Sequence, residues 1–214
     1  MKTGTTILSI GAGLGTLGGA GALTSHFLLS SRVIDVLKQK GHDFLNFEND
    51  TDLTTWKTIA KAYSAGKNKL GTLVINAPAS SQEVPEADAR KLRNACKDII
   101  NSKNYTDDTL KATEQWCVKP ITVQALANKN RKVLELEESK DNDTVQWDAK
   151  TIDYVKPNAE NKIPNATLKA VTIDKVEDRK KIKADCRTLR DKYTHDKDFH
   201  ENYKQFETWC TVNK

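Results

Sequence analysis

The stretch "TDDTLKATEQWC" (residues 106–117) ends in a Trp–Cys pair, and the same pair returns in "ENYKQFETWC" (201–210). All four tryptophans and all four cysteines of the chain fall into two such sets. The first set is Trp56, Tyr63, Cys96, Trp116 and Cys117, and the second is Trp147, Tyr154, Cys186, Trp209 and Cys210. Trp56 and Tyr63 lie seven residues apart, as do Trp147 and Tyr154. Two rare residue types that coincide in this way indicate a tandem duplication with a period of about 90 residues.

The similarity extends upstream of the first tryptophan of each set. "VLKQKGHDFLNFENDTDLTTW" (36–56) aligns with "ALANKNRKVLELEESKDNDTVQW" (125–147), and "ARKLRNACKD" (89–98) resembles "RKKIKADCRT" (179–188). The alignment sets Leu37 against Leu126, and it sets Phe44, Leu45 and Phe47 against Val133, Leu134 and Leu136. We therefore divide the chain into an N-terminal segment (1–31), a first module (32–119) and a second module (120–214).

Both modules are expected to be helical. In "DLTTWKTIAKAY" (52–63) the apolar residues recur at helical spacing, with Asp52 as the expected N-cap. Pro85 and Thr106 are expected at the starts of the next two helices. In the second module Ile182, Cys186, Leu189 and Tyr193 are expected to form one apolar stripe. The predicted fold is mostly α: an N-terminal membrane helix, then two tandem homologous helical modules, each with a cysteine-containing αα-hairpin. Residues 71–81 and their counterpart could form a long loop or a short strand.

The cysteines of each module lie on consecutive predicted helices, which favours the disulfides Cys96–Cys117 and Cys186–Cys210. Four cysteines allow three pairings, and two other states stay open. The four could be reduced and buried as small hydrophobic residues. They could also bind zinc, which the absence of a C-x-x-C pair disfavours. Disulfides persist outside the cytosol, so this pairing predicts an exported body.

The N-terminal segment contains no Asp, Glu, Lys or Arg from Thr3 to Ser31, and this length can span a bilayer. We expect residues 5–30 to contact the membrane as a retained single-pass anchor. A signal peptide cleaved near Ala20-Gly21-Ala22 is the alternative. Seven of the ten glycines precede residue 22, so the G-x-G-x-x-G match at Gly13–Gly18 is attributed to glycine density rather than to a dinucleotide site. Basic residues after the segment favour a cytoplasmic body, but the predicted disulfides favour an extracellular one in the cell membrane.

No catalytic motif is evident. The sequence contains no nucleophile elbow, H-E-x-x-H motif or phosphate loop, and its histidines have no counterparts between the modules. The basic stretches "RKLR" (90–93) and "DRKKIK" (178–183) are expected on solvated helix faces, so no nucleic-acid binding is expected. We therefore predict a non-enzymatic protein with no catalytic residue, no cofactor and no metal site.

The paired "C…WC" blocks, the junction "WCVKPITVQAL", the ending "ETWCTVNK" and the glycine-rich apolar N-terminus resemble the expanded paralogous protein families of haemotropic mycoplasmas. Most members of these families are uncharacterised, so the resemblance transfers no catalytic residue. It implies a membrane-attached, surface-exposed protein of wall-less bacteria that live on red cells. Antigenic variation, or contact with a host surface or with antibodies, would then be its role. The alternative is a cytoplasm-facing, membrane-tethered binding module with reduced cysteines.

Overall fold

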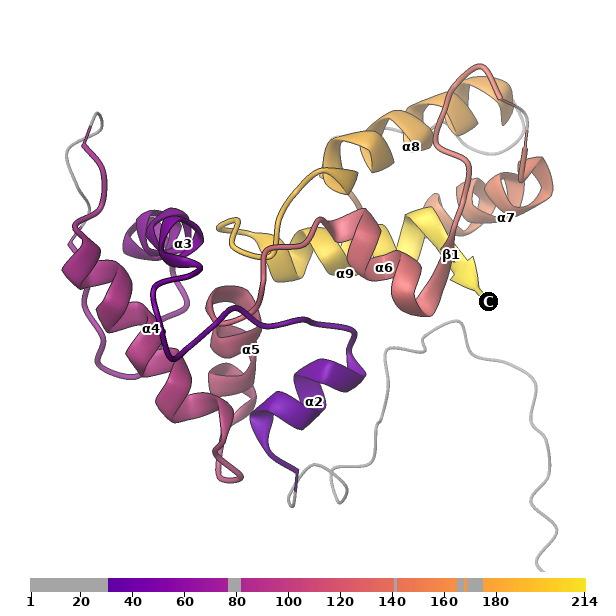
Figure 1. Ribbon diagram of the computed structural model, residues 1–214. Helices are drawn as coiled ribbons and strands as arrows, with labels where there is room; N and C mark the ends of the chain where they lie inside the picture. Colours follow the sequence, from indigo (N-terminus) through magenta and orange to yellow (C-terminus); the bar gives the residue numbers. More distant parts are fainter. Residues whose placement is uncertain (1–30, 77–81, 141, 165–167, 169–174) are drawn as a thin grey trace, which may run out of the picture.

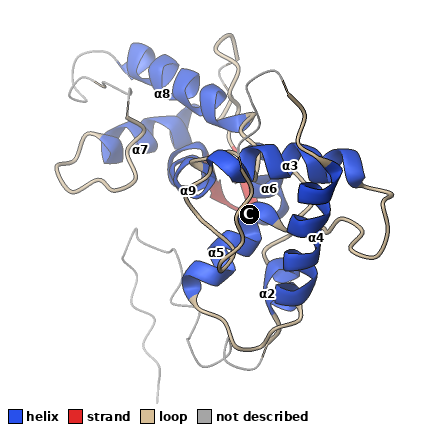
Figure 2. Cartoon of the chain, turned by 90° about the vertical axis from the view of Figure 1, so that its left-hand side faces the viewer, coloured by secondary structure: helices blue, strands red, loops and turns tan. Residues whose placement is uncertain are grey.

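The computed structural model describes residues 31–76, 82–140, 142–164, 168 and 175–214 (Figure 1). Within this part of the chain the protein is mostly helical, with eight helices and one two-stranded sheet. Figure 2 shows how little of the regular structure is strand. The predicted membrane segment lies outside the described residues. Among the helices that are described, none has the length and apolar character needed to cross a bilayer.

The first half contains four helices. They are α2 (Val33–Gln39), α3 (Leu53–Ala65), α4 (Glu86–Ile100) and α5 (Asp107–Trp116). As predicted, Pro85 directly precedes α4, and Thr106 caps α5 because its hydroxyl accepts a hydrogen bond from the Thr109 N–H at 3.1 Å. Residues 71–81 were expected to form a long loop or a short strand. Of these, residues 71–76 form neither helix nor strand. The rest of that region and all of its counterpart except residue 168 lie outside the described residues.

The second half repeats the order of helices and adds a short sheet. It contains α6 (Val123–Asn130), β1 (Arg131–Val133), α7 (Thr144–Tyr154), α8 (Lys175–Arg190), α9 (Phe199–Cys210) and β2 (Thr211–Asn213). The strands are antiparallel, with Lys132 opposite Val212. The predicted apolar stripe on α8 was too long: the helix ends at Arg190, and Tyr193 beyond it is 43% exposed.

Each half buries its own hydrophobic core. The core of the first half is drawn from residues 45–117 and includes Trp56, Tyr63 and Trp116. The core of the second half is drawn from residues 123–210 and includes Trp147, Tyr154 and Trp209. A third, small cluster joins α2 to α5 through Val36, Leu37, Leu110 and neighbouring residues. Separate cores are the usual property of separate structural units.

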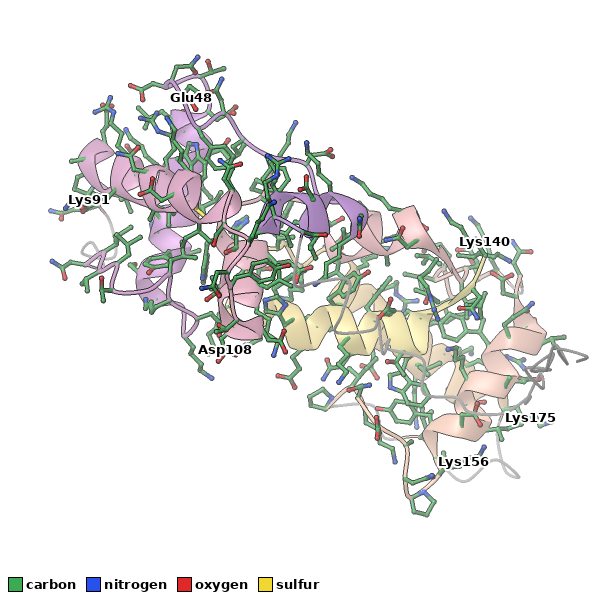
Figure 3. All side chains as sticks on the ribbon, turned by 90° about the horizontal axis from the view of Figure 1, so that it is seen from below. Glu48, Lys91, Asp108, Lys140, Lys156 and Lys175 are labelled. Atoms are coloured by element: carbon green, nitrogen blue, oxygen red, sulfur yellow. A yellow bond between two sulfur atoms is a disulfide. The ribbon has the colours of Figure 1, made fainter. Side chains whose placement is uncertain are left out.

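The surface mixes charges of both signs. Seen from below, charged side chains project from every part of the described molecule, among them Lys91, Asp108 and Lys156 (Figure 3). The whole chain carries 34 basic and 29 acidic residues, so such mixing is expected. A functional surface must therefore be identified from local contacts rather than from overall charge.

Candidate functional sites: two disulfide frameworks and the junction between them

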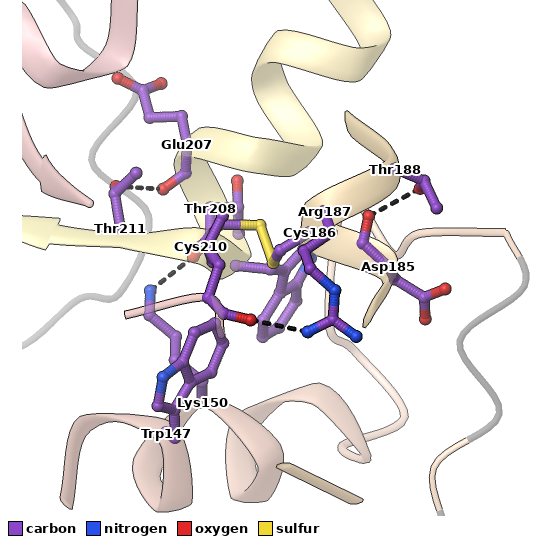
Figure 4. The surroundings of a disulfide bond; sticks show 12 residues. Trp147, Lys150, Asp185, Cys186, Arg187, Thr188, Glu207, Thr208, Cys210 and Thr211 are labelled. Atoms are coloured by element: carbon purple, nitrogen blue, oxygen red, sulfur yellow. Dashed lines mark hydrogen bonds between the residues drawn. A yellow bond between two sulfur atoms is a disulfide. The ribbon is translucent and has the colours of Figure 1, made fainter. Parts of the chain in front are cut away.

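The structure contains the two predicted disulfides. Cys96 of α4 is bonded to Cys117, which follows α5, with 5.3 Å between their Cα atoms. Cys186 of α8 is bonded to Cys210, the last residue of α9, with 5.8 Å between their Cα atoms. All four residues are fully buried. Figure 4 shows Trp147 beside the second disulfide, and Lys150 donating to the backbone carbonyl of Thr208. Each bond therefore fixes two consecutive helices to each other inside a core.

The four tryptophans all use their indole N–H in the same way. Each is almost fully buried and donates to a backbone carbonyl in a loop of its own half. The donor–acceptor pairs are Trp56–Asn46 at 3.2 Å, Trp147–Glu135 at 3.1 Å, Trp116–Asn68 at 2.7 Å and Trp209–Asn161 at 2.7 Å. A buried indole N–H needs such a partner. The tryptophans therefore hold loops against the core as well as filling it.

The two tyrosines of the predicted repeat core also have equivalent surroundings. Tyr63 donates to the Leu73 carbonyl at 2.9 Å, and Tyr154 donates to the Ile163 carbonyl at 2.8 Å. The Tyr63 ring lies edge-on to Trp116, and the Tyr154 ring lies edge-on to Trp209. Burial raises the pKa of both hydroxyls. The tyrosines therefore stay neutral and act as hydrogen-bond donors within each core.

Two aspartates make equivalent loop contacts, and the sequence analysis predicted a role only for Asp52, as an N-cap. Asp52 precedes α3 as predicted, but its side chain makes no capping bond to that helix. Its carboxylate instead accepts from the Asn46 N–H at 2.6 Å, and Asp143 accepts from the Glu135 N–H at 3.0 Å. Asn46 and Glu135 are the residues whose carbonyls accept the indole bonds. The sequence does contain the signal, because an aspartate lies four residues before Trp56 and before Trp147.

Basic residues of α4 and α8 hold the loop that precedes α3 in the first half and the loop that precedes α7 in the second. Arg90 and Arg93 both bind Asp50 at 2.7 Å, and their hydrogen bonds lower the pKa of that carboxyl to about 2. In the second half Lys183 donates to the Lys140 carbonyl at 2.7 Å, and Arg187 donates to the Leu136 carbonyl at 2.6 Å. The predicted solvated face was wrong for "DRKKIK", because its first residue, Asp178, and Lys183 are both buried.

The two halves meet at a buried carboxylate, Glu114 of α5, which is 7% exposed. Its oxygens lie 2.9 Å from His42 Nε2, 3.0 Å from Lys40 Nζ and 3.8 Å from His200 Nδ1 of α9. Burial raises the pKa of Glu114, but the hydrogen bond from His42 and the charge of Lys40 outweigh burial and lower the pKa to about 2. Burial lowers the pKa of His200. Glu114 is therefore ionised, and its carboxylate oxygens are bound by Lys40 and His42.

Other polar contacts complete this junction. Gln115 of α5 donates to the Asp196 carbonyl at 2.8 Å, and His200 Nε2 lies 3.0 Å from the Lys111 carbonyl. On the other side of the junction Lys129 of α6 binds the Asp43 carboxylate at 3.0 Å. The halves are thus joined mainly by hydrogen bonds and ion pairs, whereas each half is held together by apolar packing.

A shallow hollow of about 570 Å³ lies beside this junction. Its lining residues come from α2, from the loop that follows α2 and from the end of α6. They are Ile34, Lys38, Gly41, His42, Asp43, Phe44, Leu45, Phe47 and Lys129. Among the described residues, no group of three or more His, Cys, Asp or Glu side chains could hold a metal ion.

Sequence reasoning located all ten Trp, Tyr and Cys residues that the structure places in the two cores. It missed the junction, because His42 and His200 are far apart in the chain and have no counterparts between the modules. It also missed Asn68-Lys69 and Asn161-Lys162, although an Asn-Lys pair followed by Leu or Ile occurs once in each half. Compared with models of protein families, with curated proteins and with solved structures, the chain matches none of them.

Proposed function

We propose that the protein is a non-enzymatic, membrane-anchored protein of the outer cell surface, whose body consists of two copies of one disulfide-linked helical module. One observation carries this proposal: a buried framework of disulfide, indole, phenol and carboxylate contacts occurs twice, at residues that the sequence alignment pairs. A similar backbone contact is made by the first residue of the first helix in each half. The Val33 N–H donates to the Ser102 carbonyl at 3.0 Å, and the Val123 N–H donates to the Lys192 carbonyl at 2.7 Å.

The disulfides support an oxidising compartment for the body. Structural disulfides are rare in cytosolic proteins of mesophiles, where thiols are kept reduced. With residues 5–30 as a single-pass anchor, the disulfides support a body on the extracellular side. The alternative is a cytoplasm-facing binding module with reduced cysteines. Its support is the basic Arg32, Lys38 and Lys40, which follow the apolar segment.

A role in contact with other molecules fits the framework better than catalysis does. The residues that the two halves share are buried and hold helices and loops in place. The charged residues that differ between the halves lie outside those cores. Two modules that share core residues but differ in their charged residues suit a surface protein that meets a host surface or antibodies. The resemblance to the paralogous families of haemotropic mycoplasmas leads to the same proposal.

Protease treatment of intact cells that carry the full chain tests the location. We expect the body to be degraded without lysis, while a cytoplasmic marker protein in the same cells stays intact. Degradation of the body only after lysis would contradict the proposal and support the cytoplasm-facing alternative. Treatment of lysed cells serves as the control that the folded body is cleavable at all.

A further inference from the structure

The outer side of α2 combines an exposed cation, Lys38, with the partly buried side chain of Ile34. Val33, Val36 and Leu37 point inward, where they pack against Leu110 and Val118. Ile34 and Lys38, one helical turn apart, instead line the hollow described above. The helix is thus amphipathic, and its outward side is available to a partner.

The floor of the hollow is apolar. Ile34, Phe44 and Phe47 are only partly buried, and the two phenyl rings lie 6.2 Å apart. Side chains of this kind insert into the boundary between lipid headgroups and acyl chains. The hollow is shallow and open, which suits a surface to be covered better than a pocket that encloses a small molecule.

The rim of the hollow is basic. Lys38 and Lys129 line it directly, and two further lysines lie beside it. The Lys119 N–H donates to the Asp43 carbonyl at 2.8 Å, and Lys214 Nζ donates to the Lys129 carbonyl at 3.0 Å. The nearby acids are each paired with a base: Asp43 with Lys129, and Asp35 with Arg32. Lys38 and Lys129 against Asp43 leave the residues that line the hollow with one net positive charge, which anionic lipid headgroups attract.

The position of α2 in the chain brings this surface to the membrane. The predicted membrane segment ends at residue 30, and α2 begins at Val33. A residue of extended chain spans at most about 3.6 Å, so the start of α2 can lie no more than about 11 Å from the end of that segment. We propose that the outer side of α2 and the adjacent hollow dock onto the anionic phospholipid surface of the membrane that anchors the chain. This inference rests on the membrane anchor of the proposed function.

The test uses the full chain in lipid nanodiscs, either zwitterionic or containing anionic phospholipid, and an amine-labelling reagent at low conversion. Mass spectrometry reports the labelling of each lysine. We expect labelling of Lys38 and Lys129 to fall at least threefold in anionic discs and to recover in high salt. Lys91 and Lys156 are the internal controls, because their side chains are 60% and 51% exposed and lie far from α2 in Figure 3. Their labelling should not change.

Charge reversal supplies the second measurement. Lys38→Glu should restore the labelling of Lys129 in anionic discs, whereas the matched variant Lys91→Glu should leave it low. If the chain inserts into both kinds of disc but Lys38 and Lys129 are labelled equally in both, the proposed docking surface is wrong and the membrane anchor is not contradicted. Protection of equal size in neutral discs would also overturn it, because another occupant, such as a second copy, would then cover the hollow. A chain that enters neither disc would contradict the membrane anchor itself.

Discussion

At the residue scale, each of the four buried indole N–H groups donates to one backbone carbonyl. The indoles of Trp116 and Trp209 show this most clearly, because each donates at 2.7 Å to an asparagine carbonyl in its own half. A buried carbonyl that loses its donor retains the full cost of desolvation. Glu114 poses the same problem with a charge, and Lys40 and His42 provide the compensating contacts.

Replacing Trp209 with Phe should lower the free energy of unfolding by about 1–3 kcal/mol, because it leaves the Asn161 carbonyl without its donor and opens a small cavity. Trp116→Phe should cost a similar amount in the first half. Urea unfolding followed by circular dichroism measures both. Tyr193→Phe, at an exposed ring, is the control and should change little. A Trp209→Phe protein as stable as wild type would contradict the assigned role.

The Glu114 carboxylate predicts a specific dependence on pH. Its pKa in the folded protein is about 2, below its ordinary value of 4.5, so the unfolded chain takes up the proton first. Its contribution to stability is therefore complete above pH 4.5 and is lost as the pH falls toward 2. At full ionisation this contribution is about 3 kcal/mol. The stability difference between wild type and Glu114→Gln, measured in urea from pH 6 to pH 2.5, should shrink over that range.

Glu207, the residue that aligns with Glu114 in the second half, provides the matched control. Glu207→Gln should lower the stability at pH 6 by less than Glu114→Gln does. A Glu114→Gln difference that stays constant from pH 6 to pH 2.5 would show that the carboxylate is not held ionised by the junction.

At the element scale, each disulfide joins two helices that are consecutive in the chain. The sequence predicted this pairing because rare cysteines lie on the apolar faces of two neighbouring amphipathic segments. Helix starts at Pro85 and Thr106 were also predictable, since local chemistry sets them. The bond of Asp52 was missed because an N-cap position predicts a contact with its own helix, whereas its partner Asn46 belongs to a loop whose path depends on tertiary packing.

Removing one disulfide by the double substitution Cys96→Ala, Cys117→Ala should destabilise the first half by about 3 kcal/mol, since the bond closes a loop of about 20 residues. Removing Cys186 and Cys210 in the same way should have a similar effect on the second half. Thermal unfolding under non-reducing conditions measures both. Loss of stability in neither variant would contradict a structural role for the bonds.

Because both bonds are fully buried, a reductant should reach them only when the protein opens. In native buffer, 5 mM dithiothreitol followed by alkylation and mass spectrometry should leave the four cysteines unmodified over an hour. In 6 M guanidinium the same treatment should modify all four. Rapid modification of the folded protein would show that the cysteines are accessible and reactive rather than structural.

At the scale of the whole molecule, two apolar cores are joined by a polar junction. The sequence predicts a division into 32–119 and 120–214, because the two cores reuse residue types whose spacing is visible along the chain. The junction does not follow from the sequence. His200 reaches Glu114, beside Lys40 and His42, only once both halves are folded, and neither histidine has a counterpart in the other half.

This organisation predicts that damage to one half stays in that half. In the protein with Cys186→Ala and Cys210→Ala, hydrogen–deuterium exchange should accelerate in α7, α8 and α9, while α3 and α4 keep their wild-type rates. The converse variant at Cys96 and Cys117 should reverse the pattern. Equal acceleration in both halves would mean that the polar junction makes them a single cooperative unit.

The measurement that tests the central claim most directly is disulfide mapping on the full chain isolated from its native membrane without reduction. Mass spectrometry of unreduced peptides should find the Cys96 peptide linked to that of Cys117, and the Cys186 peptide linked to that of Cys210. Those two links in native material would support the duplicated framework together with an exported body. Four thiols that alkylate without reduction would contradict the extracellular location and favour a cytoplasm-facing module.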